Sequence, residues 1–437
     1  MKILLVQART ENPEGPIFPL GLAYLASSLP QDLPVQAVDM NVEEDPYQKI
    51  EKVGKTFRPD IIAFSVRNIK VAKPGEHISS GKELQEMAQR IKSLVPKATI
   101  VAGGAGFSLY VEPLMESIPE IDFAVVGEGE DTFRVMVEKF PKTLGIKGLV
   151  HRNGHELVFE GNSVRPDFAK LPWPRRDIFN MEVYKKYPTS VGVMTKRGCP
   201  YRCVHCSDIY LLGRRMRLRE AQDVVEELKY LKEEYDVTQF MFADQTFNVP
   251  MDYTKVLLRQ LIDADLGMRW TAYFTPEGLD EEMVDLFGRA GCYLLNFSPD
   301  CCDDVMLNRL RKGFLMRDLY RANRLAKKVG IPITYNFMMG LPGETLVSLL
   351  NTLIFTLITK IQLKKLFQLH GLFAVPVRIY PHTKLREMAV EDKLIDAKDD
   401  LLEPRFYSSK NGLVNIADKA IFSAISLLWK IKHKSFH

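Results

Sequence analysis

The stretch Lys196-Arg-Gly-Cys-Pro-Tyr-Arg-Cys-Val-His-Cys-Ser207 places Cys199, Cys203 and Cys206 in the spacing C-x3-C-x2-C. Three thiolates on one short loop can hold three irons of a four-iron cluster and leave the fourth iron open to a ligand. A structural zinc site would need a fourth protein ligand and usually has paired C-x2-C knuckles. The spacing therefore predicts an iron–sulfur cluster. A zinc loop completed by His205, or three buried cysteines, are the alternatives.

The composition is that of a soluble globular protein, with 46% hydrophobic and 26% charged residues among 437. A chain of this length predicts two or three domains. The net charge of +4 is small and gives no case for a nucleic-acid partner. None of the six cysteines fits a disulfide framework, which favours a reducing, cytoplasmic location. We expect no signal peptide, because an apolar strand opens the chain, and no transmembrane segment.

Residues 1–145 alternate apolar runs with helical patterns. This alternation predicts an α/β domain with a doubly wound parallel sheet of flavodoxin-like, Rossmann type. The five predicted strands are residues 3–6, 35–38, 61–64, 99–101 and 123–126. Ligands of such sheets bind at the carboxyl ends of the strands, where glycines let a bulky group approach the backbone. The candidate binding residues in those loops are Asp39, Ser65, Arg67, Asn68, Gly103, Gly104, Gly127, Glu128, Gly129 and Glu130.

Residues 146–190 are predicted to form a linker. Asn153-Gly154 between two apolar runs predicts a β-hairpin in it, and Leu171-Pro-Trp-Pro174 predicts an extended connector at the domain boundary. At the other end of the chain, residues 391–437 are predicted to form a short helical tail. Within it, residues 416–431 have an apolar helical face followed by lysines. That helix would dock on the core or make weak contact with a membrane surface.

Strand and helix patterns alternate again over residues 191–390. Six βα units of this length predict a partial, open (β/α)6 barrel of TIM type, with functional groups at the carboxyl ends of its strands. The predicted strands are residues 190–195, 239–243, 268–273, 292–297, 333–338 and 373–379. Besides the cysteine loop, the candidate cofactor-binding residues at these ends are Asp244, Ser298, Asp300, Gly340 and Glu344.

The cysteine loop and the later turns resemble the radical SAM family, whose open iron binds S-adenosylmethionine (SAM). The stretch Gly340-Leu-Pro-Gly-Glu-Thr345 is very similar to that family's pattern, and Arg217 and Arg219 resemble the R-x-R that follows its cysteine loop. Either arginine could pair with the SAM carboxylate through its fork of N–H donors, although a surface helix start accounts equally well for each. One turn departs from the pattern: relatives often have G-I-E-S where this chain has Phe297-Ser-Pro-Asp-Cys-Cys302.

The resemblance implies a role for each strand end. The residue after the second barrel strand, Asp244, would contact the methionyl amine of SAM. Ser298 and Asp300, after the fourth strand, would contact the ribose, and the turn from Gly340 to Glu344 would contact the adenine.

The first domain resembles the cobalamin-binding domain that precedes many radical SAM cores. The likeness rests on Val101-Ala-Gly-Gly104 followed by Val125-Val-Gly-Glu-Gly-Glu130. The motif D-x-H-x-x-G is missing, and the first histidine of the chain is His77. The resemblance therefore implies cobalamin bound without a histidine ligand from the protein. A sheet domain that binds nothing is the alternative.

These likenesses together imply a class B radical SAM methyltransferase with a 4Fe-4S cluster, SAM and cobalamin, acting on an unactivated carbon. The alternatives are a radical rearrangement, cyclisation or oxidation without methyl transfer, a non-catalytic regulator that binds SAM or cobalamin, and a zinc-stabilised binding module. A methylthiotransferase is disfavoured, because no cysteine precedes Cys199. The implied partners are a small-molecule or lipid substrate and an electron donor such as flavodoxin or ferredoxin. The remaining cysteines, Cys292, Cys301 and Cys302, are predicted to have packing and helix-start roles.

Overall fold

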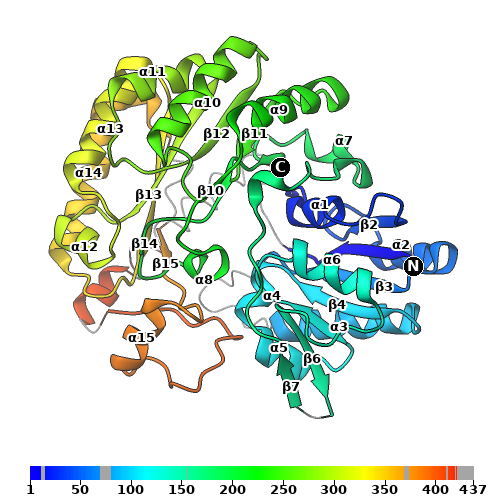
Figure 1. The fold of residues 1–437 in the computed structure, drawn as a ribbon. Coiled ribbons are helices and arrows are strands. Elements are labelled where there is room, and N and C mark those ends of the chain that lie inside the picture. The colour runs from blue at the N-terminus through cyan, green and yellow to red at the C-terminus, as the bar shows by residue number, and fades with distance from the viewer. Residues whose placement is uncertain are drawn as a thin grey trace.

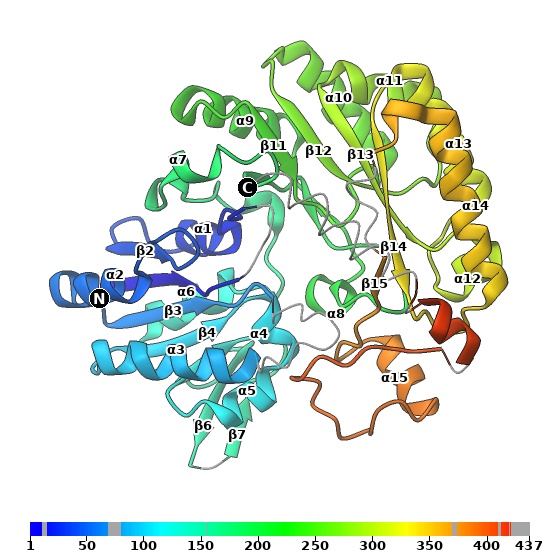
Figure 2. The ribbon, with the colours of Figure 1, turned by 180° about the vertical axis from the view of Figure 1, so that it is seen from behind.

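The computed structural model describes residues 1–10, 15–68, 80–154, 156–368, 374–409, 412–418 and 420. Two α/β units lie against each other in Figure 1. The first is a sheet between helices, in blue and cyan, and the second is a curved sheet coated by helices, in green to orange. The view from behind in Figure 2 shows helix α8 (Asp208–Leu212) between the two units.

The first sheet has seven strands in the order β2-β1-β3-β4-β5-β6-β7. Strands β1 to β5 pair in parallel, whereas β6 and β7 are antiparallel. The bounds are β1 Ile3–Gln7, β2 Val35–Asp39, β3 Ile61–Ser65, β4 Thr99–Gly103, β5 Phe123–Val125, β6 Leu149–Asn153 and β7 Glu156–Phe159. All five predicted strands and the flavodoxin-like order of the sheet are confirmed.

The predicted hairpin forms, but it belongs to the first sheet and not to a separate linker. Strand β6 pairs with β5, and the side chains of Leu149 and Val150 are buried in the core of the first unit. An apolar strand next to an unpaired sheet edge buries its side chains and satisfies its backbone best by joining that sheet.

Two helix pairs cover the faces of the first sheet. Helix α1 (Leu20–Ser27) contacts α6 (Glu130–Lys139), and α2 (Pro46–Phe57) contacts α3 (Ser80–Leu94). The other two described helices of this unit are α4 (Ala105–Leu109) and α5 (Val111–Ser117). Helix α2 shows how local sequence sets such bounds: Asp45 caps it by accepting from the Gln48 amide, and it ends at Arg58 in the left-handed conformation.

The second sheet has six parallel strands in the order β15-β14-β13-β12-β11-β8. The bounds are β8 Gly192–Val193, β11 Gln239–Phe242, β12 Arg269–Phe274, β13 Cys292–Asp300, β14 Ile333–Met339 and β15 Ala374–Pro376. Their order follows the chain, and among the described residues β8 and β15 do not pair with each other. The predicted open, partial barrel is therefore confirmed.

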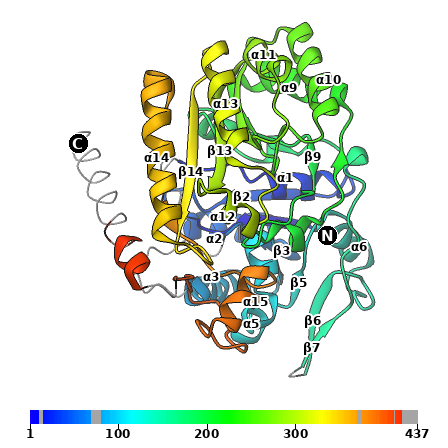
Figure 3. The same cartoon turned by 90° about the vertical axis from the view of Figure 1, so that its left-hand side faces the viewer.

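Helices coat the outer side of this barrel, and Figure 3 shows α13 and α14 as neighbours along its edge. The bounds are α9 Ala221–Tyr235, α10 Met251–Ala264, α11 Glu281–Arg289, α12 Asp304–Arg309, α13 Met316–Val329 and α14 Leu346–Leu363. The shorter elements are the 3-10 turns Phe168–Lys170, Arg176–Ile178 and Lys364–Leu366, α7 Met181–Tyr184, β9 Lys196–Arg197, β10 Arg217–Leu218 and α15 Lys384–Glu391. Residues 412–418 are helical, and most of the predicted helix at 416–431 lies outside the described residues.

Within the described chain, one stretch, Leu346–Leu366, is long and apolar enough to cross a membrane by length and composition alone. This stretch is longer than the apolar run considered in the sequence. Its inner side is fixed to the barrel, because the Asn351 amide donates to Asp303 over 2.8 Å and the Thr352 hydroxyl accepts from the Cys302 amide over 2.9 Å. Helix α14 therefore forms part of the coat of the barrel in this structure.

Candidate active site

The loop that carries the three cysteines leaves β9 in a conformation that requires glycine. Gly198 has a φ of +94°, and a Cβ there would collide with the carbonyl oxygen of Arg215. The next amide, that of Cys199, donates to the carbonyl of Gly213 over 3.1 Å. The first cysteine is thus held by backbone contacts to the far end of the same loop.

The thiols of Cys199, Cys203 and Cys206 are half-buried and form no disulfide. Burial raises the pKa of each thiol, so each stays protonated until a bound cation displaces the proton. Among the described residues, no three His, Cys, Asp or Glu side chains converge closely enough to hold one metal ion. The cysteines of a 4Fe-4S cluster each bind a different iron, so this spacing suits a cluster better than a single zinc ion.

His205, the alternative fourth zinc ligand, faces a carboxylate. Its Nε2 lies 3.6 Å from an oxygen of Asp300. Burial lowers the pKa of His205, which favours the neutral ring. Its Nδ1 is buried and has no hydrogen-bond partner within the described chain. This geometry does not support a zinc site completed by His205, and the orphaned nitrogen is one that a bound group would satisfy.

The carboxyl end of the fourth barrel strand, β13, is held by a buried ion pair. The Nζ of Lys312 lies 2.7 Å from an oxygen of Asp300, and both residues are buried. Burial acts to lower the pKa of Lys312, but the Asp300 carboxylate outweighs it and the pKa is raised. Ser298 accepts a hydrogen bond from Asn336 on the next strand. The structure therefore brings Asp300 beside the cysteine loop, as predicted, together with a lysine that we did not predict.

Asp244, after the second barrel strand, is engaged by the protein itself. One oxygen accepts from the Thr195 amide over 2.8 Å, and the other accepts from the Thr195 hydroxyl over 2.6 Å and the Lys196 ammonium over 3.0 Å. A buried carboxylate with both oxygens bonded has little capacity left for a ligand. The predicted contact with the SAM amine is thus not supported, and Asp244 holds the strand end that leads into the cysteine loop.

The turn after the fifth strand joins the end of the described chain. Gly340 has a φ of +67°, and its amide donates to an oxygen of Asp418 over 3.2 Å. Glu344 is buried and accepts from the Leu341 amide over 3.1 Å. Burial, and then the neighbouring Asp418 carboxylate, raise the pKa of Glu344 to about 8. Glu344 therefore holds the backbone of this turn, and its role in binding SAM stays a prediction.

Arg217 and Arg219 are both committed to carboxylates of the protein. Arg217 donates to Glu128 over 3.0 Å and through a second, shorter contact to the same side chain. Arg219 donates to Glu227 over 2.5 Å and to Asp223 over 2.7 Å. Both arginines are thus engaged by carboxylates of the protein, although the Nε of Arg217 has no hydrogen-bond partner among the described residues. The contact of either arginine with the SAM carboxylate stays a prediction.

Glu128 and Glu130 contact the root of the cysteine loop. Arg197, at the root of the cysteine loop, donates to Glu128 over 2.8 Å and to Glu130 over 2.6 Å. All three side chains are buried. In this structure these carboxylates join the first unit to the barrel, and their contact with cobalamin stays a prediction.

The register of the first sheet aligns several predicted residues at one edge. Gln7 pairs with both Asp39 and Ser65, and Ser65 pairs with Gly103. Asp39 is again committed, because it accepts from the Tyr184 hydroxyl over 2.6 Å. Burial raises the pKa of Asp39. The predicted role of Asp39 in ligand binding is not supported, whereas Ser65 and Gly103 lie side by side at the strand ends.

Glycines leave this edge of the sheet free of bulky side chains. Gly104 has a φ of +94° and Gly127 a φ of +80°, conformations that favour glycine, and Gly129 precedes α6. Arg67 and Asn68 follow β3 and are exposed. A strand-end surface made of backbone and small side chains fits a broad, flat ligand such as a corrin ring.

Sequence reasoning missed several residues that shape the site. Lys196 and Arg197 had a signal: two basic residues on a buried stretch imply buried carboxylate partners. Lys312, Tyr184 and Asp418 had no such signal, because each meets its partner only after folding.

Comparison with known families assigns both units. The Radical SAM superfamily model matches residues 193–355, and the B12 binding domain model matches residues 6–137. Each match falls within one of the two units described above. The Radical SAM match includes the whole cysteine loop.

Several known proteins are similar over most of the chain. An uncharacterized methyltransferase of Pyrococcus horikoshii is 29% identical over 407 residues, which cover 90% of this chain and 84% of that protein. The cytidylyl-2-hydroxyethylphosphonate methyltransferase of Streptomyces wedmorensis is 26% identical, covering 74% of this chain and 69% of that protein.

Among solved structures, the radical SAM methyltransferase TsrM from Kitasatospora setae, with cobalamin and a 4Fe-4S cluster bound, has the same fold. It aligns with a TM-score of 0.77 at 23% identity, over 90% of this chain and 75% of that one. The two family matches, the order of the two units and the shared fold agree. The chain belongs to the radical SAM superfamily, among the enzymes that carry a B12-binding domain ahead of the barrel.

Proposed function

We propose that this chain is a cobalamin-dependent radical SAM methyltransferase that acts on an unactivated carbon. The observation that carries the proposal is the buried contact of Arg197 with Glu128 and Glu130. This contact places a loop of the B12-binding domain at the root of the cysteine loop. A radical generator and a methyl donor must reach the same carbon, so their two binding sites must open onto the same substrate cavity.

In this proposal, Cys199, Cys203 and Cys206 hold the 4Fe-4S cluster, and the bound cofactors supply a 5′-deoxyadenosyl radical and a transferable methyl group. The chain itself positions and shields these groups. Lys312 orients the Asp300 carboxylate beside the cysteine loop. The backbone of the Gly340 turn borders the same end of the barrel.

The cobalamin site is proposed at the edge formed by Ser65, Gly103 and Gly104, with Gly127 and Gly129 beside it. We propose that no histidine of the chain binds cobalt. In the described part of the first unit, His151 is turned to Glu160, with its Nε2 at 3.0 Å from the carboxylate. His77 and His155 lie outside the described residues.

The proposed substrate is a small molecule or a lipid, and the proposed electron donor is a flavodoxin or ferredoxin. All six cysteines are free thiols. Free thiols and an oxygen-sensitive cluster both fit a reducing compartment, so we propose a cytoplasmic location.

The test uses the full chain, reconstituted anaerobically with iron, sulfide and cobalamin, and SAM labelled in its methyl group. We expect 5′-deoxyadenosine, transfer of label to the bound cobalamin, and label in a product when a small-molecule or lipid extract is added. Formation of 5′-deoxyadenosine without label on cobalamin or on any product would instead identify a radical rearrangement or oxidation. A colourless protein that retained only zinc would exclude both.

A further inference from the structure

Helix α14 has an inward side that mixes polar and apolar residues and an outward side that is apolar. The buried inward residues are Ser348, Phe355, Thr359 and Leu363. The outward apolar side chains are between 44% and 65% exposed. They are Leu346, Val347, Leu350, Leu353, Ile354, Leu357 and Ile361. A surface helix of a soluble protein normally turns charged and polar residues outward.

The outward residues form one continuous stripe, called here the α14 stripe. At 3.6 residues per turn, all seven fall within a sector of about 120°. The helix cannot rotate to hide them, because its inner side is bonded to the barrel. Asn351 donates to Asp303 over 2.8 Å, and Asn323 on α13 donates to the Thr359 hydroxyl over 2.8 Å.

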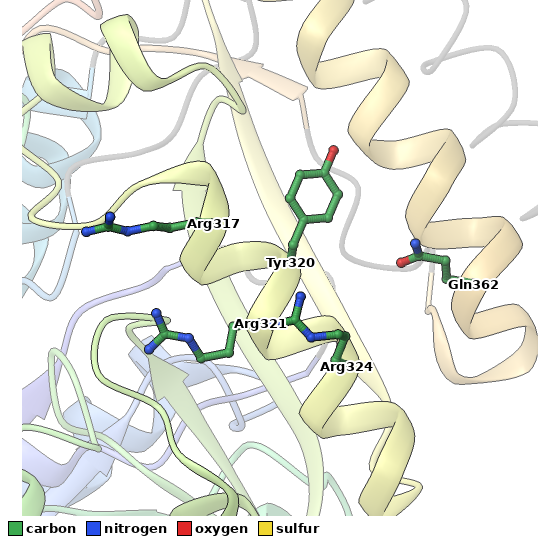
Figure 4. A pocket seen from close by; sticks show the side chains of 5 residues that line it. All are labelled: Arg317, Tyr320, Arg321, Arg324 and Gln362. Atoms are coloured by element: carbon green, nitrogen blue, oxygen red, sulfur yellow. The ribbon is translucent and has the colours of Figure 1, made fainter.

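Arginines flank this stripe on the neighbouring helix. A pocket of about 430 Å³ between α13 and α14 is lined by Arg317, Tyr320, Arg321, Arg324 and Gln362. Figure 4 shows the three arginines on one helix, with Gln362 across from them on α14. Arg321 pairs with Asp318 over 2.9 Å, whereas Arg317 and Arg324 form no ion pair with the described residues.

The charge of this whole face is positive. Residues 316–366 contain eight lysines and arginines but only two acidic residues, Asp318 and Glu344. Glu344 is buried, Asp318 offsets Arg321 through their ion pair, and Lys328 pairs with Glu281 on α11, so the excess positive charge comes from the remaining cations. Lys360, Lys364 and Lys365 lie exposed near the carboxyl end of the stripe.

An apolar stripe flanked by cations matches the surface of an anionic lipid bilayer. A second copy of this chain is a poorer partner, because a two-fold interface would bring the same cations face to face. Figures 1 and 2 show α13 and α14 on the side of the barrel away from the first unit, so the first unit does not cover this face.

We propose that the α13–α14 face docks this enzyme on an anionic phospholipid membrane. The α14 stripe enters the boundary between headgroups and acyl chains, and the arginines of the pocket contact headgroup phosphates. The helix lies along the surface and does not cross the bilayer, since its inner side stays bonded to the barrel. This proposal does not rest on the methyl-transfer activity.

The test is flotation of the purified full chain with vesicles of phosphatidylcholine alone, or of phosphatidylcholine mixed with phosphatidylglycerol. We expect binding to the mixed vesicles, weak binding to phosphatidylcholine, and loss of binding as salt approaches about 1 M, where screening acts within about 3 Å.

Variants separate the two parts of the surface. Leu350→Glu and Leu357→Glu should each weaken partitioning about tenfold, because a buried leucine side chain contributes at least that much. Arg317→Ala and Arg324→Ala should each weaken it about fivefold on mixed vesicles only. The matched controls are Leu144→Glu in the first unit, where the leucine is 74% exposed, and Arg289→Ala on α11. Both should bind as the wild type does, and thermal unfolding should confirm that every variant is folded.

Four results would overturn the proposal. One is that the wild type does not float with mixed vesicles. Another is that the stripe variants bind as well as Leu144→Glu does. The third is that binding appears only after residues 421–437 are deleted, which would mean that the chain itself covers the stripe. A dimer that Leu357→Glu converts to monomer, without vesicle binding, would assign the face to a second copy instead.

Discussion

Glu128 of the B12-binding domain and Arg197 of the barrel form a buried ion pair with a separation of 2.8 Å. Arg197 also reaches Glu130 over 2.6 Å, and it precedes Cys199 by only two residues. The position of the first unit is therefore coupled directly to the loop proposed to hold the cluster. Any change that loosens these carboxylates should also disturb the cysteines.

The first prediction concerns this contact. Arg197→Met should lower the free energy of unfolding by about 3–5 kcal/mol, because it leaves Glu130 buried without its cation. Anaerobic urea unfolding measures the loss, and the iron content after reconstitution should fall with it. The matched control is Arg134→Met, which removes a half-exposed pair with Glu138 and should cost less than about 1 kcal/mol. Equal costs for the two variants would contradict the coupling.

The second prediction separates the six cysteines. Alanine at Cys199, Cys203 or Cys206 should prevent formation of a stable cluster and abolish cleavage of SAM, because each thiolate binds a different iron. Iron analysis and formation of 5′-deoxyadenosine measure the two effects.

The control for this prediction comes from the cysteines outside the loop. Cys292 is buried, and burial raises its pKa to about 12, so it is an inert packing thiol. Cys292→Ala should therefore keep its iron and its activity. Full iron content in Cys206→Ala would disprove the proposed ligand set.

The third prediction concerns Asp244. Asp244→Asn should destabilise the chain by about 3–5 kcal/mol, because Lys196 is buried and would lose its carboxylate. Adding Lys196→Met should restore part of that loss, since the double variant leaves no charge unpaired. Thermal unfolding of the single and double variants provides the comparison. If Asp244 instead contacts SAM, the single variant would raise the KM for SAM and leave stability unchanged.

The fourth prediction concerns pH. The pKa of Glu344 is raised to about 8 in the folded chain from an ordinary value near 4.5. Between these values the folded state holds a proton that the unfolded state has released, so stability should fall as the pH rises from about 4.5 to 8. One such group changes stability by at most about 1.4 kcal/mol per pH unit.

Glu344→Gln should flatten this dependence, because glutamine is neutral throughout the range. Unfolding measured at several pH values between about 5 and 9 tests it, with Glu387→Gln on the exposed end of α15 as the control. A pH profile that is unchanged in Glu344→Gln would show that another group, such as Asp418, carries the proton.

The fold was accessible from the sequence because its signals are local. Strand runs such as Ile61–Ser65 and the helix Ala221–Tyr235 are set by the spacing of apolar residues over a few turns or pleats. The cysteine loop is likewise a local pattern. Ser298 and Asp300 could be placed because parallel strands of a barrel present their carboxyl ends on one side.

The partners of the charged residues could not be predicted from local sequence patterns. Arg217 and Arg219 have the spacing expected for a SAM contact, yet they pair with Glu128 and Glu227. Glu128 is 89 residues away from Arg217 in the chain. The periodicity of the sequence does not predict such a pairing, because the pairing depends on which surfaces of the two units come together.

The sequence by itself determined that a first α/β sheet domain is followed by a barrel, and that a cysteine loop has the spacing of an iron–sulfur site. Both follow from apolar periodicity and short-range spacing, which are properties of neighbouring residues. Only the tertiary structure decided that Glu128 and Glu130 join the domains, that Asp244 supports the loop, and that the apolar side of α14 is exposed. Each of these depends on burial and on long-range charge pairing, which arise only when the two units are packed.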